Sequence, residues 1–143
     1  MNPPDYQQQA KLARALTRGH VKLVEALDKE LAQHDMTSAQ YAVVSALASG
    51  RANSAGQICN EISYDSGAMT RMLDRLQTKN FINRVRSTDD RRVVKLELTE
   101  RGRKVYPTLR TCSSVAIDQM LQGIEQKDIE HVEFLLEKML ANK

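Results

Sequence analysis

This sequence of 143 residues contains no tryptophan and only 4% aromatic residues, so aliphatic side chains must fill most of its core. It has no apolar run near the roughly 20 residues that a membrane-spanning helix needs. Its first residues lack a basic stretch followed by an apolar stretch, so we expect no secretory signal. The two cysteines, Cys59 and Cys112, lie far apart and exclude a disulfide framework. We expect inert buried thiols in a reducing cytoplasm, with oxidant sensing as the alternative for each.

Signatures of catalysis and of metal binding are also missing. The three histidines, His20, His34 and His131, lie far apart in the sequence. There is no Cys/His set at metal-ligand spacing, no phosphate-binding loop and no nucleophile elbow. We therefore expect no enzyme, no cofactor and no metal. The composition, 41% apolar and 27% charged, is that of an ordinary globular domain, and we expect one domain over residues 1–143.

The charge that is present is distributed unevenly. Residues 71–104 carry 11 Lys/Arg and 5 Asp/Glu, a net charge of +6. The rest of the chain carries 10 Lys/Arg and 13 Asp/Glu, a net charge of −3. A basic segment on an acidic body is the electrostatic footprint of a surface that binds a polyanion.

Helical periodicity covers the first half of the chain. Leucines from Leu12 to Leu31 recur at steps of four and seven and predict a long amphipathic helix over residues 6–32. A second helix is predicted over residues 37–50, with Thr37 or Ser38 as its cap, and a third over residues 54–63, capped by Ser54.

A fourth helix is predicted over residues 65–80. Asp65 or Ser66 supplies its cap, and Asn80 can end it in a left-handed conformation. One apolar stripe faces inward, formed by Met69, Met72, Leu73 and Leu76. The opposite face is left to solvent, with Gly67, Thr70, Arg71, Asp74 and Arg75.

The period then changes from helix to strand. Residues 81–87 and 93–99 are β-prone, and Val94, Leu96 and Leu98 alternate with Val93, Lys95 and Glu97. The polar residues between them, Ser-Thr-Asp-Asp-Arg-Arg, predict a hairpin with a projecting tip. Thr99 caps a further long helix, in which Pro107 either causes a bend or lies in the first turn. After Gly123 comes a last helix, with an apolar stripe formed by Ile129, Val132, Leu136, Met139 and Leu140.

This order of elements predicts a fold that is mainly helical with a β-hairpin, a winged helix-turn-helix. In such a fold a helix enters the major groove of DNA and the hairpin reaches a neighbouring minor groove, where an arginine is attracted. The candidate contacts on the helix are Ser66, Gly67, Ala68, Thr70, Arg71 and Arg75. At the hairpin tip, Arg91 or Arg92 would enter the groove while Asp90 holds an arginine or the turn backbone. The alternative is that these residues form only a solvated turn.

Residues 37–102 resemble the MarR family of bacterial transcription regulators. Asp90-Arg91-Arg92 followed by Leu-Thr-Glu-Arg-Gly is similar to the wing signature of that family, and residues 63–76 are similar to its recognition helix. The resemblance implies an intertwined homodimer on double-stranded operator DNA. Residues 6–34 and 104–143 would dimerise, and residues 37–102 would form the DNA-binding lobe. It also implies a repressor of efflux, stress or aromatic-compound response genes, among them antibiotic resistance genes.

The resemblance further implies release by small phenolic or aromatic acids such as salicylate. Their contacts would fall on Thr70 and Arg84, with a second set at Ala68, Met72 and Arg75. The alternative for Thr70 and Arg84 is a role in DNA binding or wing packing. The interlobe crevice lined by the first, second and fifth helices is another candidate site. His20 and Tyr41 would be polar groups there, or would have core or surface roles only.

A second class of function stays open on the sequence alone. Some winged-helix modules dock another protein and do not bind operator DNA. Such modules lack clustered positive charge and a basic hairpin tip, whereas this chain has both features.

Overall fold

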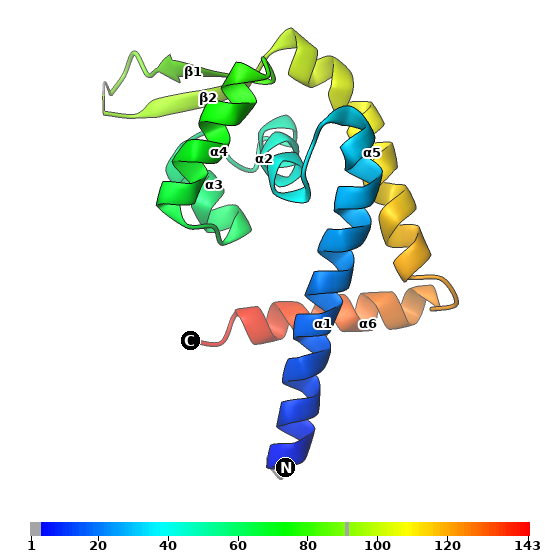
Figure 1. Cartoon of the computed structure of the whole chain (residues 1–143). Coiled ribbons are helices and arrows are strands. Elements are labelled where there is room, and N and C mark those ends of the chain that lie inside the picture. The colour runs from blue at the N-terminus through cyan, green and yellow to red at the C-terminus, as the bar shows by residue number, and fades with distance from the viewer. Residues whose placement is uncertain (1–3, 91) are drawn as a thin grey trace.

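The computed structural model describes residues 4–90 and 92–143. Within them the chain forms helices and one two-stranded antiparallel sheet, in the order α1 (Tyr6–Leu31), η1 (Ala32–His34), α2 (Ser38–Ala48), α3 (Ala55–Ile62), α4 (Ser66–Thr78), β1 (Ile82–Arg86), β2 (Val94–Leu98), α5 (Glu100–Met120) and α6 (Gln126–Leu140). Figure 1 shows the short helices and the hairpin gathered in one lobe, from which α1, α5 and α6 extend. The predicted fold class is confirmed.

Short polar side chains start the helices as the sequence predicts. Thr37, Ser54, Asp65 and Thr99 each accept a hydrogen bond from a backbone N–H of the first turn that follows. Asn80 ends the segment after α4 with a φ of 64°, the left-handed geometry expected of it.

The core of the lobe is built from aliphatic side chains of the helix-turn-helix and the sheet. The apolar stripe of α4 is buried against Val44 of α2, Ile58 of α3 and Ile82 of β1. Leu109 of α5 closes the same cluster and is fully buried. This packing fixes the orientation of α4 and leaves its polar face outward.

The expected burial of Cys59 needs correction, and the structure settles two further points. Pro107 lies inside α5 and not in its first turn; Figure 1 shows this helix changing direction in its first half, as expected where a proline removes a backbone hydrogen bond. Cys59 is only partly buried, although Cys112 is buried as predicted. Val94 lies towards the hairpin tip and is 39% exposed, whereas Leu96 and Leu98 are buried.

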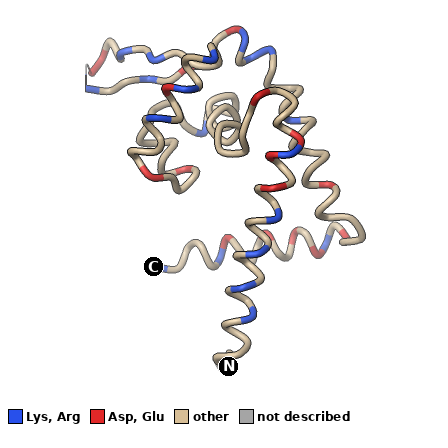
Figure 2. The backbone as a smooth tube through the Cα atoms, viewed as in Figure 1, with Lys and Arg blue, Asp and Glu red and all other residues tan. Residues whose placement is uncertain are grey.

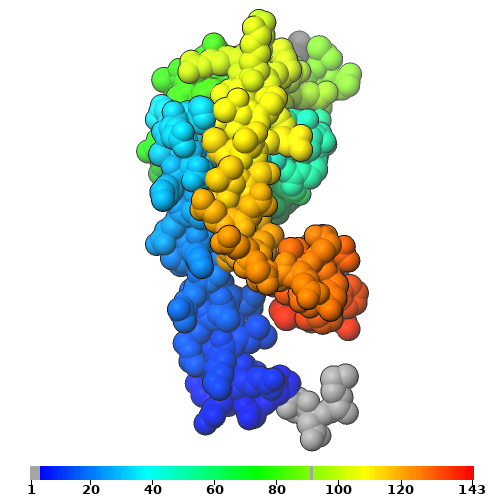
Figure 3. Space-filling model, turned by 90° about the vertical axis from the view of Figure 1, so that its right-hand side faces the viewer, coloured from blue at the N-terminus to red at the C-terminus, as the bar shows by residue number. Residues whose placement is uncertain are grey.

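The dimerisation segments predicted from the sequence protrude from the lobe. Leu12 and Leu16 of α1 are 47% and 43% exposed, and no residue of α6 is buried. Figure 3 shows α6 standing apart from the N-terminal half of α1. Within the described residues, no helix is both long and apolar enough to cross a membrane.

Candidate nucleic-acid interface

The outward face of α4 carries most of the predicted DNA contacts. Ser66, Gly67, Thr70, Arg71 and Arg75 are exposed, while Ala68 is partly buried. Asp65 accepts a hydrogen bond from the backbone N–H of Ala68 at 2.9 Å, which fixes the first turn of the helix. The Thr70 hydroxyl donates to the carbonyl of Ser66 at 3.1 Å, so its oxygen is left to accept a bond from outside.

The two arginines of this face are available to a partner. Arg71 and Arg75 lie one helical turn apart, and neither takes part in any of the ion pairs found among the described residues. Guanidinium groups spaced this way suit two phosphates or one phosphate and a guanine edge.

The hairpin tip has a defined hydrogen-bonded turn. The hydroxyl of Ser87 accepts bonds from the backbone N–H groups of Asp89 and Asp90 at 3.3 and 3.4 Å. The carboxylate of Asp90 accepts a bond from the backbone N–H of Arg92 at 3.0 Å. Asp90 therefore holds the turn backbone, one of the two roles predicted for it. Arg92 is exposed, and Arg91 lies outside the described residues.

A polar clamp joins the hairpin to α4. The Arg84 side chain on β1 forms an ion pair with Asp74 on α4, with Nη2 2.8 Å from Oδ1. Its Nη1 also donates to the side-chain oxygen of Gln77 at 2.6 Å. These bonds connect the two elements predicted to touch DNA and hold β1 beside the C-terminal half of α4.

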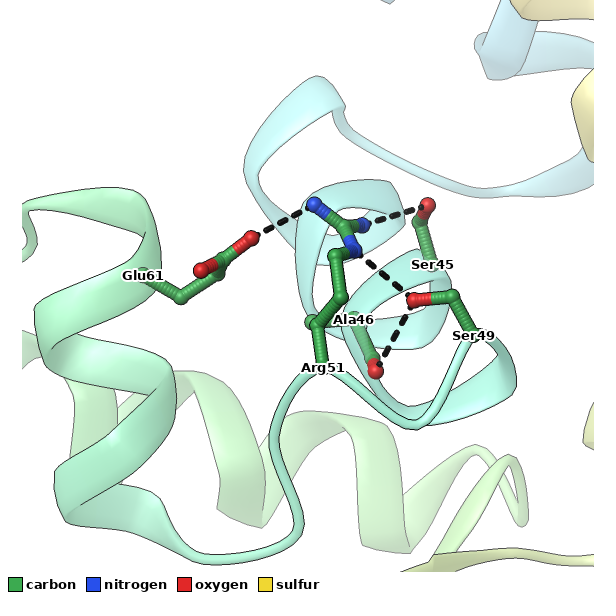
Figure 4. A network of polar contacts seen from close by, with 5 residues as sticks. All are labelled: Ser45, Ala46, Ser49, Arg51 and Glu61. Carbon is green, nitrogen blue, oxygen red and sulfur yellow. Dashed lines mark hydrogen bonds and ion pairs between the residues drawn. The ribbon is translucent and has the colours of Figure 1, made fainter.

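The helix-turn-helix has a second network that the sequence did not indicate. Figure 4 shows the guanidinium of Arg51 between α2 and α3. It donates to Glu61 at 2.6 Å, to Ser49 at 2.8 Å and to Ser45 at 3.1 Å. Arg51 is followed by a segment that pairs with the hairpin, since the Leu96 N–H donates to the carbonyl of Asn53 at 2.8 Å. These bonds connect α2, α3 and β2.

The predicted ligand contacts are divided among different places. A cavity of about 470 Å³ lies between α1, α2 and α4, and Ala68, Met72 and Arg75 line it together with Arg71 and Asp28. Thr70 and Arg84 are not among its described lining residues. His20 is exposed on α1. Tyr41 is partly buried and stacks on Tyr106, with ring centroids 6.5 Å apart.

The electrostatics favour an anionic partner for this side of the lobe. Figure 2 shows Lys and Arg residues along the hairpin and α4. Acidic residues are present too, but Asp74 is paired with Arg84 and Asp90 is bound to the turn backbone. Among the residues that the structure describes, no group of three or more potential ligand side chains could hold a metal ion.

Comparisons with known proteins agree with this geometry. The family described as "Transcriptional regulator SarA/Rot" matches residues 22–109. The chain is 28% identical to the multiple antibiotic resistance protein MarR of Escherichia coli over 130 residues, 90% of each chain. It is 25% identical to the transcriptional regulator MhqR of Bacillus subtilis over 132 residues, 92% of this chain and 91% of that protein.

Solved structures lead to the same family. A cysteine-to-serine variant of E. coli MarR in complex with operator DNA matches with a TM-score of 0.84 and 25% identity, over 96% of this chain and 99% of that one. The relatives are transcription regulators and not enzymes. With its family match over 22–109 and its winged helix-turn-helix, this chain belongs to the SarA/Rot and MarR family of winged-helix transcription regulators.

Proposed function

We propose that this protein is a cytoplasmic, homodimeric repressor that binds operator DNA through α4 and the hairpin tip. The observation that carries the proposal is the clamp between Arg84 and Asp74, 2.8 Å long. It ties the strand that leads to the hairpin tip and Arg92 to the helix that carries the exposed Arg71 and Arg75. Elements held together in this way can contact a major groove and the adjacent minor groove at a smaller ordering cost.

The proposed dimer accounts for apolar surface that a single chain leaves in water. Val132 and Phe134 of α6 are 53% and 60% exposed, and Val115 and Ile117 of α5 are 40% and 36% exposed. Apolar side chains gathered on protruding helices mark an interface. A two-fold dimer through residues 6–34 and 104–143 would cover them and present two α4 helices about one turn of DNA apart, roughly 34 Å.

We also propose that a small phenolic or aromatic acid such as salicylate releases the DNA, and that the controlled genes serve efflux, stress or aromatic-compound responses. A carboxylate that bonds Arg84 would compete with Asp74 and loosen the hairpin from α4. The cavity beside Arg75 is a second place for such an acid, and the surroundings of His20 and Tyr41 are a third. Release requires that the ligand bind more tightly to a dimer whose α4 helices are wrongly placed.

A gel-shift titration with the DNA that flanks the protein's own gene tests the proposal. We expect specific binding that weakens as salt rises, because phosphate contacts release counterions. Replacing both Arg71 and Arg75 by Ala should abolish it. The control Arg110→Ala, at an exposed arginine of α5 away from α4 and the hairpin, should keep it, with sedimentation equilibrium to verify that the control is still a dimer. Binding that survives the double substitution would contradict the proposed surface. No binding to any flanking DNA would favour the alternative, a winged-helix module that docks a protein. Addition of salicylate to the bound complex tests release separately.

A further inference from the structure

The C-terminal end of α4 is bonded to the turn between α1 and α2 through Lys79, the residue that follows the helix. Its ammonium donates to the backbone carbonyl of Asp35 at 2.6 Å and to the side-chain oxygen of Gln40 at 3.2 Å. A longer ion pair joins the same Nζ to Oδ2 of Asp35 at 3.4 Å. An ammonium has three N–H groups, and these three acceptors can engage all of them. We refer to Lys79, Asp35 and Gln40 as the α4 joint.

Gln40 connects the α4 joint to the start of α2. It is 5% exposed, and its Oε1 also accepts a bond from the backbone N–H of Thr37 at 3.2 Å. Its own backbone N–H donates to the Thr37 hydroxyl at 3.1 Å. The backbone N–H of Ser38 donates to the carboxylate of Asp28 on α1 at 2.7 Å. A series of hydrogen bonds therefore leads from α1, which extends out of the lobe, to the end of α4 (Figure 1).

The α4 joint lies close to the proposed DNA contacts. The backbone N–H of Lys79 donates to the carbonyl of Arg75 at 2.9 Å, so one helical turn separates the joint from an arginine of the exposed face. The same end of α4 is bonded to β1 through Arg84 and is therefore held from two sides. The Lys79 side chain is only 26% exposed and its ammonium is already engaged, so the residue is better suited to hold the helix than to contact a phosphate.

The joint can be broken without leaving a buried acceptor unpaired. A cavity of about 370 Å³ borders Lys79, so hydrogen bonds, more than close packing, hold its side chain. Without the ammonium, the carbonyl of the exposed Asp35 would be open to water, and Oε1 of Gln40 would keep its bond from Thr37. The largest penalty for a lost hydrogen bond, an unsatisfied buried group, therefore does not arise. A variant at Lys79 should fold, and its effect on DNA binding can be measured.

We propose that Lys79 is a positioning residue for operator binding, which holds α4 to the turn between α1 and α2 in the position where its arginines meet DNA. The inference rests on the function proposed above and adds the residue through which a displacement of α1 reaches α4. Lys79 acts through Asp35 and Gln40 and does not touch DNA. Without the joint, α4 binds the same operator but must be ordered on the DNA, at a cost in affinity.

Lys79→Met removes the ammonium and keeps a long side chain. We expect its operator affinity, measured by fluorescence anisotropy, to fall about three- to tenfold. The slope of log affinity against log salt should stay that of the wild type, because no phosphate contact is lost. Lys79→Arg retains a charged donor and should keep most of the affinity.

Two further variants serve as controls. Asp35→Asn removes the 3.4 Å ion pair but leaves the carbonyl bond, so it should bind DNA like the wild type. Asparagine also tolerates the left-handed φ of 53° at this position. Lys104→Met removes the same charge from an exposed lysine of α5 and should also bind like the wild type. Urea unfolding and sedimentation equilibrium verify that each variant is folded and has the oligomeric state of the wild type.

Hydrogen exchange of the protein without DNA separates this inference from the proposed function. In Lys79→Met we expect faster amide exchange at residues 35–41 and 76–80, with α6 unchanged. Equal exchange in wild type and variant would refute the joint, whether or not the protein binds DNA. If exchange rises but the wild type binds no operator, the proposed function fails and the role of Lys79 in operator binding fails with it.

The titrations with DNA can overturn the proposal in three distinct ways. A salt slope that falls by about one in Lys79→Met would make Lys79 a phosphate contact. An equal loss of affinity in Lys104→Met would mean that net charge, and not the joint, governs binding. An unchanged affinity in a folded Lys79→Met protein would mean that the joint has no part in placing α4 on DNA.

Discussion

Arg84 on β1 and Asp74 on α4 form an ion pair 2.8 Å long that joins the hairpin to the helix beside it. The arginine also donates to Gln77, so two bonds set its position. Asp74 remains 60% exposed, so solvent screening limits the contribution of the ion pair to the free energy of unfolding. Its proposed effect is on the relative position of α4 and the hairpin, the two elements that we propose contact DNA, because a small change in their geometry would weaken binding.

We expect Arg84→Ala to weaken operator binding about three- to tenfold, with a loss of folding stability below about 1 kcal/mol. The substitution frees the hairpin, which must then be ordered when DNA binds. Fluorescence anisotropy with labelled operator measures the affinity, and thermal unfolding at fixed protein concentration measures the stability. Arg84→Lys can keep the ion pair with Asp74 and should retain part of the affinity. Equal affinity for wild type and Arg84→Ala would show that the clamp is not needed.

Substitutions at Asp89 and Asp90 can separate two effects on operator binding, the hydrogen bond that holds the turn and the negative charge of the hairpin tip. Both are exposed carboxylates at the hairpin tip, but only Asp90 accepts a hydrogen bond from the Arg92 backbone. We expect Asp90→Ala to weaken operator binding about two- to tenfold, the value of one such bond. Asp89→Ala removes the same negative charge and should leave binding unchanged or slightly stronger. If both substitutions strengthen binding equally, repulsion of the phosphates outweighs positioning of the turn.

Arg92 should act on DNA and not on the fold. Its side chain is exposed, so we expect Arg92→Ala to change the free energy of unfolding by less than about 1 kcal/mol. Operator affinity should fall, and the slope of log affinity against log salt should decrease by about one if the lost contact is a phosphate. Titrations at several salt concentrations measure this slope. An unchanged affinity would remove the hairpin tip from the proposed interface.

The sequence predicted features that depend on local chemistry. Helix caps such as Thr37 and Asp65 depend on neighbours a few residues away, and the stripe of α4 depends only on helical periodicity. The exposed candidates Thr70, Arg71 and Arg75 followed from the same periodicity. These parts of the fold and of the candidate site could therefore be predicted from the sequence alone.

Contacts between distant elements could not be predicted in the same way. The pairing of Arg84 with Asp74 depends on how β1 packs against α4. The sequence left open whether Arg84 binds a ligand, binds DNA or packs the hairpin. Arg51 lies between the second and third predicted helices, where no sequence pattern singled it out, yet it joins α2 to α3 through Glu61. Such contacts depend on the direction of each side chain and on the angle between helices. The spacing of residues along the sequence does not determine either of these.

The last residue of the Leu-Thr-Glu-Arg-Gly segment offers a test of packing alone. Gly102 is buried in the first turn of α5, and a Cβ there would collide with the carbonyl oxygen of Phe81. We expect Gly102→Ala to lower the free energy of unfolding by about 2 kcal/mol, because backbone must move to admit the methyl group. Gly56, in α3, has open space around it, so Gly56→Ala should leave stability unchanged or raise it by up to about 1 kcal/mol. Urea unfolding at one protein concentration compares the two variants. Equal stability of both would mean that the contact between α5 and residue 81 yields without cost.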